Sequence, residues 1–182
     1  MNTEIEVRIL DIDKDELISK LEENNAEFIG DWLQVRYVYD FKPVDPHRWI
    51  RLRTNGITNT LTIKEVHDKT EHGTKELEIE VSSIELTHEI LEKLGYKRRS
   101  IQENKRVRYI LNDVEIDVDT WPKLNTYVEF EADSLDKIKE VIKLLGFKLF
   151  DTYNTVSIYD NLEHVIECYV LDKETYFGFI NR

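Results

Sequence analysis

The sequence predicts an α+β fold in which an antiparallel β-sheet closes into a barrel and helices pack on its outside. Most of the chain alternates in steps of two between charged and apolar residues, which is the period of a strand. Three short segments instead repeat their apolar residues at helical spacing. The charged strand faces are so numerous that we expect them to line the interior of a wide barrel, with the helices covering its apolar outer face.

Three segments have the pattern of amphipathic helices: residues 13–25, 84–95 and 134–146. In the last of these, Ser134 suits the N-cap position, and Gly146 suits the left-handed position that ends a helix. The side chains expected to face inward are Leu17, Ile18 and Leu21 in the first helix, Leu86, Ile90, Leu91 and Leu94 in the second, and Leu135, Ile138, Val141, Ile142 and Leu145 in the third.

An internal repeat relates the second and third helices, each together with the strand before it. The matching positions, all at one offset, are residues 77–80 with 128–131, Ser83 with Ser134, and Gly95 with Gly146. The simple interpretation is a duplicated unit of one strand followed by one helix. The opening strand at residues 4–7, with its own helix, resembles this unit more loosely.

The length and composition are those of one domain. With 182 residues, of which 41% are apolar, we expect a single domain over residues 1–182, with residues 151–182 as a C-terminal appendage that loses clear periodicity. Cys168 is the only cysteine, so we expect no disulfide within the chain. No secretory leader and no apolar run of roughly 20 residues is present, which predicts a cytoplasmic protein outside the membrane.

The formal net charge of −12 argues against a nucleic-acid partner. Nucleic-acid-binding proteins gain most of their affinity by placing Lys and Arg against phosphates, and a strongly acidic chain repels such polyanions. The sequence leaves open whether two copies pair into a homodimer.

Charged residues two positions apart share a strand face, and in this chain they form blocks of one sign. The blocks are Glu4 and Glu6 (followed by Arg8), Arg51 and Arg53, Glu76 with Glu78 and Glu80, Arg106 and Arg108, Asp117 and Asp119, and Glu129 and Glu131. One alternative is that these faces are the solvated side of an ordinary antiparallel sheet. Like charges on neighbouring strands repel, however, so we expect a metal to neutralise the carboxylates and phosphates to neutralise the cations.

Carboxylates in number, without a histidine or cysteine pattern, suit Mg²⁺ or Mn²⁺ rather than zinc. The histidines show no ligand spacing and are expected at the surface or in loops: His47, His67, His72, His88 and His164. Trp32, Trp49 and Trp121 are expected to be packing residues, although Trp49 lies two residues before Arg51 and should share its face. Lys105 faces opposite to Arg106, and we expect it to be exposed.

Several of these segments, in order, resemble the motifs of the CYTH superfamily, the triphosphate tunnel metalloenzymes. The segment EIEVR at residues 4–8 resembles the family's ExExK motif. The other matching segments are RLR at 51–53, LTIK at 61–64, EIE at 78–80, Arg106 with Tyr109 for the KxRxxY strand, Asp119, and YVEFE at 127–131. Three positions differ: Arg8 stands where the family has lysine, Asn104 where it has a basic residue, and residues 119–122 replace a glycine-containing loop.

This resemblance covers about residues 1 to 150 and implies an eight-stranded tunnel that binds a small-molecule triphosphate with one or two divalent cations. It implies metal ligands at Glu4, Glu6, Asp119, Glu129 and Glu131, and phosphate-binding residues at Arg51, Arg53, Lys64 and Arg106. Arg108 is grouped with the phosphate-binding residues as the i+2 neighbour of Arg106. Glu78, Glu80 and Asp117 are expected to line the tunnel, and Arg8 occupies the catalytic motif position.

The resemblance is compatible with three functions: a metal-dependent triphosphatase, an adenylyl cyclase that makes cyclic AMP from ATP, and a binding module without turnover. Arg8 bears on the choice, because the resemblance implies that the lysine of the family's motif helps to activate water. A lysine can lose its proton when it is buried, whereas an arginine effectively cannot. Hydrolysis of inorganic, nucleoside or thiamine triphosphate is ranked first, with metal-bound water or a carboxylate as the base.

Overall fold

The computed structural model describes residues 5–66, 74–122, 124–147 and 175–177. The chain forms two compact units. The first unit consists of residues 33–104 with the terminal segments 1–3 and 165–182, and the second unit consists of residues 4–32 and 105–164. Glu4 and most of the predicted appendage lie outside the described residues.

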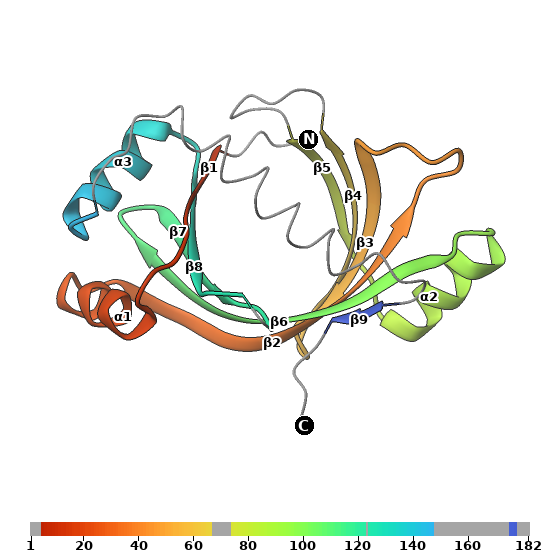
Figure 1. The fold of residues 1–182 in the computed structure, drawn as a ribbon, viewed down its shortest axis with the longest axis horizontal. Coiled ribbons are helices and arrows are strands. Elements are labelled where there is room, and N and C mark those ends of the chain that lie inside the picture. Colours follow the sequence, from red (N-terminus) through yellow and green to blue (C-terminus); the bar gives the residue numbers. More distant parts are fainter. Residues whose placement is uncertain (1–4, 67–73, 123, 148–174, 178–182) are drawn as a thin grey trace. The chain divides into compact units, whose positions relative to one another are not determined.

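The described residues form nine strands and three helices, which are labelled in Figure 1. In chain order they are β1 (Ile5–Ile9), α1 (Lys14–Glu23), β2 (Glu27–Asp40), β3 (Arg48–Thr54), β4 (Asn59–Val66), β5 (Thr74–Glu80), α2 (Ile84–Lys93), β6 (Arg98–Leu111), β7 (Val114–Thr120), β8 (Tyr127–Ala132), α3 (Leu135–Leu144) and β9 (Thr175–Phe177).

Eight strands form one antiparallel sheet with the order β1-β8-β7-β6-β2-β3-β4-β5, and β9 adds to β6 in parallel. The predicted eight-stranded antiparallel sheet and its three helices are therefore confirmed. The predicted closure into a barrel is not, because the strand order ends at β1 and β5 and no pairing joins these two strands among the described residues. Strand alternation specifies which residues share a face, but it does not specify whether the first strand pairs with the last.

In the second unit, helices α1 and α3 cover the apolar face of β1, β8, β7 and the second half of β6 (Figure 1). The buried core contains Leu17, Leu21, Val107, Tyr109, Ile116, Val118, Val128, Phe130, Ile138, Val141, Ile142 and Leu145. The inward face predicted for these two helices is confirmed, with Ile18 and Leu135 half-buried beside the fully buried positions.

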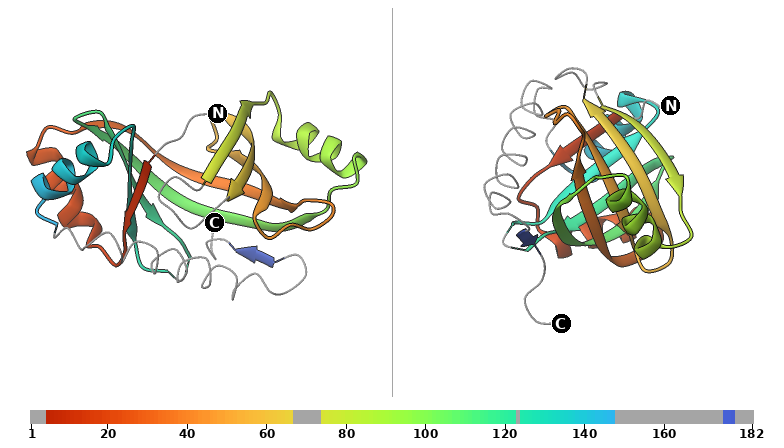
Figure 2. Two further views of the ribbon diagram at one scale, coloured as in Figure 1. Left: turned by 90° about the horizontal axis from the view of Figure 1, so that it is seen from above. Right: turned by 90° about the vertical axis from the view of Figure 1, so that its right-hand side faces the viewer.

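In the first unit, α2 packs on β3 (Figure 2). Its residues Ile84 and Leu91 are buried against Tyr39, Ile50 and Leu52. The prediction that Leu86, Ile90 and Leu94 also face inward is wrong, since these side chains are 62%, 57% and 69% exposed. The apolar stripe of α2 is wider than the strip that β3 covers, so one side of it remains uncovered. The apolar face of β5 is likewise exposed, at Leu77 and Ile79.

The ends of the helices confirm the repeat found in the sequence, because α2 follows β5 and α3 follows β8 at matching positions. At the start of α2, the backbone N–H of Leu86 donates to Ser83 Oγ at 3.2 Å. Ser134 is the N-cap of α3, as predicted, but its side chain makes no capping bond. Gly95 and Gly146 follow the two helices with φ of +90° and +78°, a conformation that glycine adopts without strain. In the described part of the chain, none of the helices is long and apolar enough to cross a membrane.

Candidate functional site

An acidic row crosses three strands on the polar face of the second unit. Glu6 of β1 lies opposite Glu131 of β8, which in turn lies opposite Glu115 of β7. Residues paired across an antiparallel sheet share a face, so these three glutamates stand side by side. We call Glu6, Glu131 and Glu115 the acidic row. Their mutual repulsion is relieved in part by Arg8, which lies 2.6 Å from Glu6, and by Arg108, which lies 2.6 Å from Glu115.

The next row across the same strands begins and ends with an arginine: Arg8, Glu129, Asp117 and Arg108. Arg8 contacts Glu129 through Nε and lies 2.6 Å from Glu6 through Nη2. Arg108 donates from Nε and Nη2 to the two carboxylate oxygens of Asp117, each at 2.7 Å. Both arginines are therefore held by carboxylates of this face.

Arg106 lies among three carboxylates in the adjoining row, opposite Asp119. It donates from Nε to Asp119 Oδ1 and from Nη2 to Glu129 Oε2, both at 2.8 Å, and it also contacts Asp117. All four side chains are buried. Burial works to lower the pKa of Arg106, but the charges of Asp119 and Asp117 raise it well above its ordinary value. The guanidinium is thus a permanent counter-ion for these carboxylates.

Tyr127 continues this row on the other side of Asp119. It is buried, and its hydroxyl accepts a hydrogen bond of 2.9 Å from Trp121 Nε1. Burial, together with the negative charges of Asp119 and Glu129, raises the pKa of Tyr127 well above its ordinary value. The phenol therefore stays protonated and can act only as a neutral hydrogen-bonding group.

The carboxylates of this face have the chemistry of a divalent-cation site. Glu6, Asp119, Glu129 and Glu131 offer only oxygen atoms, which Mg²⁺ and Mn²⁺ prefer. Among the described residues, no three Asp, Glu, His or Cys side chains are grouped so that they could hold a metal ion. Arg106 already binds Asp119 and Glu129. A cation at these residues therefore has to compete with Arg106.

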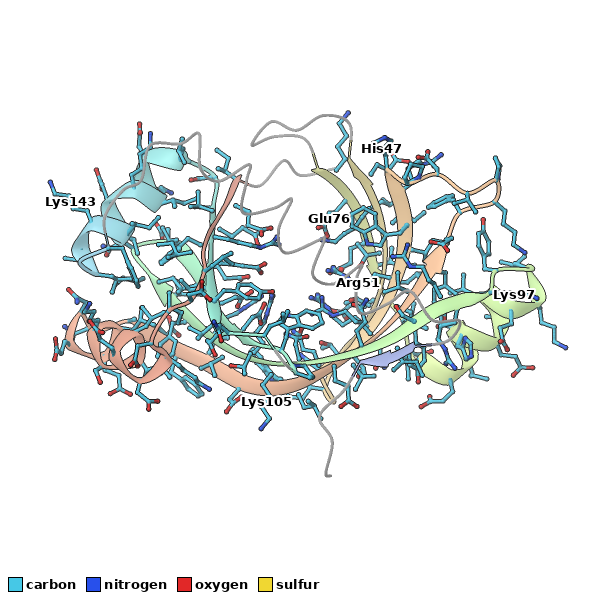
Figure 3. The ribbon with its side chains drawn as sticks, in the orientation of Figure 1. His47, Arg51, Glu76, Lys97, Lys105 and Lys143 are labelled. Atoms are coloured by element: carbon cyan, nitrogen blue, oxygen red, sulfur yellow. The ribbon has the colours of Figure 1, made fainter. Side chains whose placement is uncertain are left out.

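The polar face of the first unit carries the predicted phosphate-binding residues. Figure 3 shows Arg51 of β3 and Glu76 of β5 on the same side of the sheet. Arg51 lies 3.3 Å from Glu78 and 3.5 Å from Glu76, and Lys64 of β4 also contacts Glu76. Arg53 lies 3.9 Å from Glu78. Each of these three cations is thus within ion-pair distance of a glutamate on β5.

The two glutamates are held in their charged form by these neighbours. Burial works to raise the pKa of Glu76, but the charges of Lys64 and Arg51 lower it below its ordinary value. The pKa of Glu78 is also lowered, because the hydrogen bond from Thr62 and the charge of Arg51 outweigh its burial. At neutral pH, the two glutamates are therefore negatively charged, and they face the cations of β3 and β4.

The structure brings the predicted site residues that it describes together in two groups, one in each unit. The first unit holds Arg51, Arg53, Lys64 and Glu78, and the second unit holds Glu6, Arg8, Arg106, Arg108, Asp117, Asp119, Glu129 and Glu131. Glu80 shares the face of Glu78 on β5 but is exposed, opposite Thr60. Lys105 is exposed, as predicted, and points away from the sheet (Figure 3).

Three charged residues that we did not assign to the site belong to these faces: Arg36, Glu76 and Glu115. Each lies two residues from another polar position of its strand, so strand alternation already held the signal. Trp49 shares the polar face of β3, opposite Lys64, as its position before Arg51 predicted. The surface position predicted for His88 is wrong, because its ring is half-buried and forms a 2.8 Å hydrogen bond with the hydroxyl of Tyr39.

Comparison with known proteins agrees with the motifs. Residues 2–151 match the profile of the CYTH domain, and the chain therefore belongs to the CYTH family. A search of curated proteins found no match. The PH1012 protein of Pyrococcus horikoshii is 26% identical with a TM-score of 0.70, over 80% of this chain and 92% of its own.

Two further solved structures share the fold. A conserved hypothetical protein of Pyrococcus furiosus is 27% identical with a TM-score of 0.70, again over 80% of this chain and 92% of its own. HpAC1 of Hippeastrum, described as a candidate adenylyl cyclase with a dominant triphosphatase activity, is 13% identical with a TM-score of 0.60, over 86% of this chain and 96% of its own. The CYTH family thus includes proteins described as triphosphatases and as adenylyl cyclases.

Proposed function

We propose that this chain binds the triphosphate of a small molecule together with Mg²⁺ or Mn²⁺ and hydrolyses one of its phosphoanhydride bonds. The observation that carries the proposal is the acidic row. Arg8 pairs with Glu6 and Arg108 pairs with Glu115, but on this described face six carboxylates (Glu6, Glu115, Asp117, Asp119, Glu129 and Glu131) accompany three arginines (Arg8, Arg106 and Arg108), and this excess of negative charge favours a role in binding a cation. Membership of the CYTH family supports a triphosphate as the ligand that accompanies the cation.

The residues that would hold the cation are Glu6, Asp119, Glu129 and Glu131, joined by Glu4, which lies outside the described residues. Glu115 is added because the register places it beside Glu131, although a cation there has to compete with Arg108, which lies 2.6 Å from Glu115. A divalent cation at these carboxylates would supply charge neutralisation of the phosphoryl oxygens. Asp117 is better assigned to structure, since two arginines bind it.

The residues that would hold the phosphoryl groups are Arg51, Arg53 and Lys64 of the first unit. Arginine presents a planar set of donors that matches phosphoryl oxygens in pairs, and lysine adds a point charge. Their present partners, Glu76 and Glu78, are partly exposed and can be exchanged for a more highly charged ligand. Hydrolysis then requires that water attack a phosphorus atom while the bridging P–O bond breaks.

The proton released by that water needs a base, and Arg8 is unsuited to the role because a guanidinium keeps its proton. Arg8 is also bound by Glu6 and Glu129. We therefore assign the base to a carboxylate of the acidic face and assign Arg8 to stabilising the charge that develops on the phosphoryl oxygens. One turnover gives two phosphate products. The oxygen of the water joins the attacked phosphorus, the leaving phosphate keeps the bridging oxygen, and the protons of the water pass to the products or to the solvent.

The proposal is tested by incubating the protein with Mg²⁺ or Mn²⁺ and a panel of inorganic, nucleoside and thiamine triphosphates. Phosphate, pyrophosphate and cyclic nucleotide are measured in the same samples. Phosphate release that is abolished by chelation and by Glu131→Gln supports the proposal. Cyclic AMP with pyrophosphate as the products of ATP would identify a cyclase instead.

A second candidate is a binding module that holds the triphosphate without turnover. Arg8 favours it, because the ion pairs with Glu6 and Glu129 leave a permanently charged group at the catalytic motif position. The same incubation distinguishes the two functions when calorimetry is added. Tight triphosphate binding without any product, in the presence of either metal, would select the binding module.

A further inference from the structure

An exposed apolar stripe runs along α2 (light green in Figure 1). Leu86, Ile90 and Leu94 follow one another at intervals of four residues, so they lie on one side of the helix over a length of about 12 Å. Their exposed fractions are 62%, 57% and 69%. A hollow of about 360 Å³ lies against these side chains, and Glu89 and Lys93 also line it. We call Leu86, Ile90 and Leu94 the α2 stripe.

The stripe lies on the side of α2 that faces β5. His88 follows Leu86 by two residues and precedes Ile90 by two, which places it on the opposite side of the helix. Its ring forms a hydrogen bond with the hydroxyl of Tyr39 on β2. Because β2 and β5 lie on opposite sides of β3 in the strand order, the stripe is directed towards β5.

The apolar surface continues on β5 itself. Leu77 and Ile79 are 56% and 57% exposed. The register aligns them through β4 with Ile50 and Leu52 of β3, so they belong to the sheet face on which α2 packs. Single exposed apolar residues are ordinary, whereas a contiguous apolar surface is typical of an interaction site.

The internal repeat shows what covers the equivalent surface in the second unit. The last two positions of the stripe match Val141 and Leu145 of α3, which are each 1% exposed. These two side chains share a core with Leu17 and Leu21 of α1. In the described part of the first unit, no second helix lies beside α2. The stripe therefore has the composition of a helix–helix contact whose second helix has to come from elsewhere.

The charged residues beside the stripe suit a second copy of the same helix. Glu89 and Lys93 are both exposed, on one flank of the stripe. When two copies of α2 pack antiparallel about a two-fold axis at Ile90, Leu86 meets Leu94 of the partner subunit. Glu89 then lies within one helical turn of Lys93 of the partner subunit, and the axis repeats this ion pair on the same flank. The stripe and its flank are thus complementary to themselves.

We infer that two copies of this chain form a homodimer through the α2 stripe, with the two α2 helices antiparallel. Burial of the apolar side chains of both copies stabilises the pair, and the ion pairs between Glu89 and Lys93 fix its direction. The same axis places β5 of both copies on one side of the helix pair, so Leu77 and Ile79 enlarge the buried area. The inference does not depend on the proposed function, which uses the polar face of the sheet.

Sedimentation equilibrium over a series of protein concentrations up to about 1 mM measures the dissociation constant of the dimer. Ile90→Glu places two carboxylates against each other at the axis and should raise this constant by about a hundredfold or more. Ile57→Glu is the matched control, because Ile57 is 78% exposed and lies between β3 and β4. The control should dimerise like the wild type. Circular dichroism checks that both variants fold.

Charge reversal tests the antiparallel arrangement. Glu89→Lys and Lys93→Glu each bring like charges together across the axis, so each variant alone should dimerise about tenfold more weakly than the wild type. In a mixture of the two variants, opposite charges meet again. The mixture should therefore form a heterodimer as tight as the wild-type dimer, and a chain that carries both substitutions should also regain the wild-type affinity.

Four outcomes decide the inference. A chain that stays monomeric up to about 1 mM would overturn it, as would a dimer that Ile90→Glu leaves intact. If Ile90→Glu lowers the free energy of unfolding of a monomeric chain, a segment of the same chain covers the stripe and the inference is wrong. A mixture of the charge-reversed variants that associates no more tightly than each alone would overturn the antiparallel arrangement. If Ile90→Glu does not fold, the two charge reversals, which are at exposed positions, decide.

Discussion

Arg36 of β2 places a positive charge beside a residue of the neighbouring strand β6. The family pattern has a basic residue at the position of Asn104, and this chain has a neutral amide there. Arg36 of β2 reaches Asn104 Oδ1 at 2.6 Å, so a guanidinium stands beside the position from which the strand's own cation is missing. Strand alternation predicted which face each residue takes, but only the register reveals that these two residues meet.

A first residue-scale prediction concerns the carboxyl pKa of Glu76, which lies below the ordinary value of 4.5 because of Lys64 and then Arg51. Lys64→Met should raise this pKa, whereas the pKa of Glu78, which depends on Thr62 and Arg51, should change little. Because both pKa values are lowered by folding, the stability that they contribute is present above the ordinary pKa and is lost as pH falls through the folded values. Side-chain NMR titration measures both groups, and equal shifts would contradict the assignment.

A second residue-scale prediction concerns Arg8, which contacts Glu6 and Glu129. Arg8→Lys replaces one cation by another, so triphosphate affinity should stay within about tenfold, with only the planar donor geometry lost. Because a buried lysine can release its proton, hydrolysis should become faster and its pH profile should gain a basic limb. Steady-state rates across pH provide the measurement. A slower variant with unchanged affinity would show instead that Arg8 stabilises the transition state.

At the scale of strands, alternation predicted both polar faces, but it could not predict how each charge is neutralised. The arginines of β6 were expected to bind phosphate, and the carboxylates of β7 and β8 to bind metal. The register instead pairs Arg106 with Asp119 and Arg108 with Asp117. Residues that lie on three strands meet only after the sheet has formed, so sequence spacing alone carries no information about these ion pairs.

The next prediction concerns the stability of the folded chain, because Arg106 of β6 binds carboxylates of β7 and β8. Arg106→Gln leaves the buried carboxylates of Asp117, Asp119 and Glu129 without their shared counter-ion, which should lower the free energy of unfolding by about 3–5 kcal/mol. Under the proposed function, Mn²⁺ should restore more stability to this variant than it adds to the wild type. Urea denaturation with and without Mn²⁺ measures both effects. Arg108→Gln, at a more exposed position, is the control and should cost less.

The helices show the same limit of sequence analysis. Periodicity placed all three correctly, yet the inward face was right for α1 and α3 and wrong for much of α2. Helical spacing identifies an apolar stripe, but how much of the stripe is buried depends on what packs against it. In the second unit two helices share one apolar face, whereas in the described part of the first unit one helix, α2, packs on β3.

Two neighbouring residues of α2 test this difference. Leu91 is 6% exposed and Ile90 is 57% exposed. Leu91→Ala should therefore lower the free energy of unfolding by about 2–5 kcal/mol, whereas Ile90→Ala should change it by about 0.5 kcal/mol or less. Chemical denaturation of the two variants provides the comparison. A loss at Ile90 as large as that at Leu91 would mean that this side of the helix is buried in the folded protein.

For the whole molecule, the net charge of −12 does not show that the polar faces of the two units differ in composition. The acidic row lies in the second unit. Arg36 and Arg53, which the register places opposite each other, lie in the first unit. Composition predicted repulsion of bulk polyanions, and strand alternation predicted local sites of both signs. Barrel closure could not be read from alternation, because pairing of the first and last strands depends on the accumulated twist and stagger of every strand between them.

These two faces predict separate responses to a cation and to an anion. A ligand that binds the folded chain alone stabilises it by about 2.7 kcal/mol at a hundredfold excess over its dissociation constant. For a chain of this length, that corresponds to a rise of about 5–10 °C in Tm. Under the proposed roles, Mn²⁺ should act through the acidic row and tripolyphosphate through the arginines. Thermal scans with each ligand alone and with both together measure these responses.

Matched variants decide whether each response belongs to its own face. Glu131→Gln should remove most of the Mn²⁺ effect and keep the tripolyphosphate effect, while Arg53→Gln should do the reverse. Without ligands, Glu131→Gln should be at least as stable as the wild type, because a neutral amide relieves the repulsion from Glu6 and Glu115. If Glu131→Gln is less stable without ligands and still responds fully to Mn²⁺, the acidic row is held by ion pairs within the protein and is not a cation site.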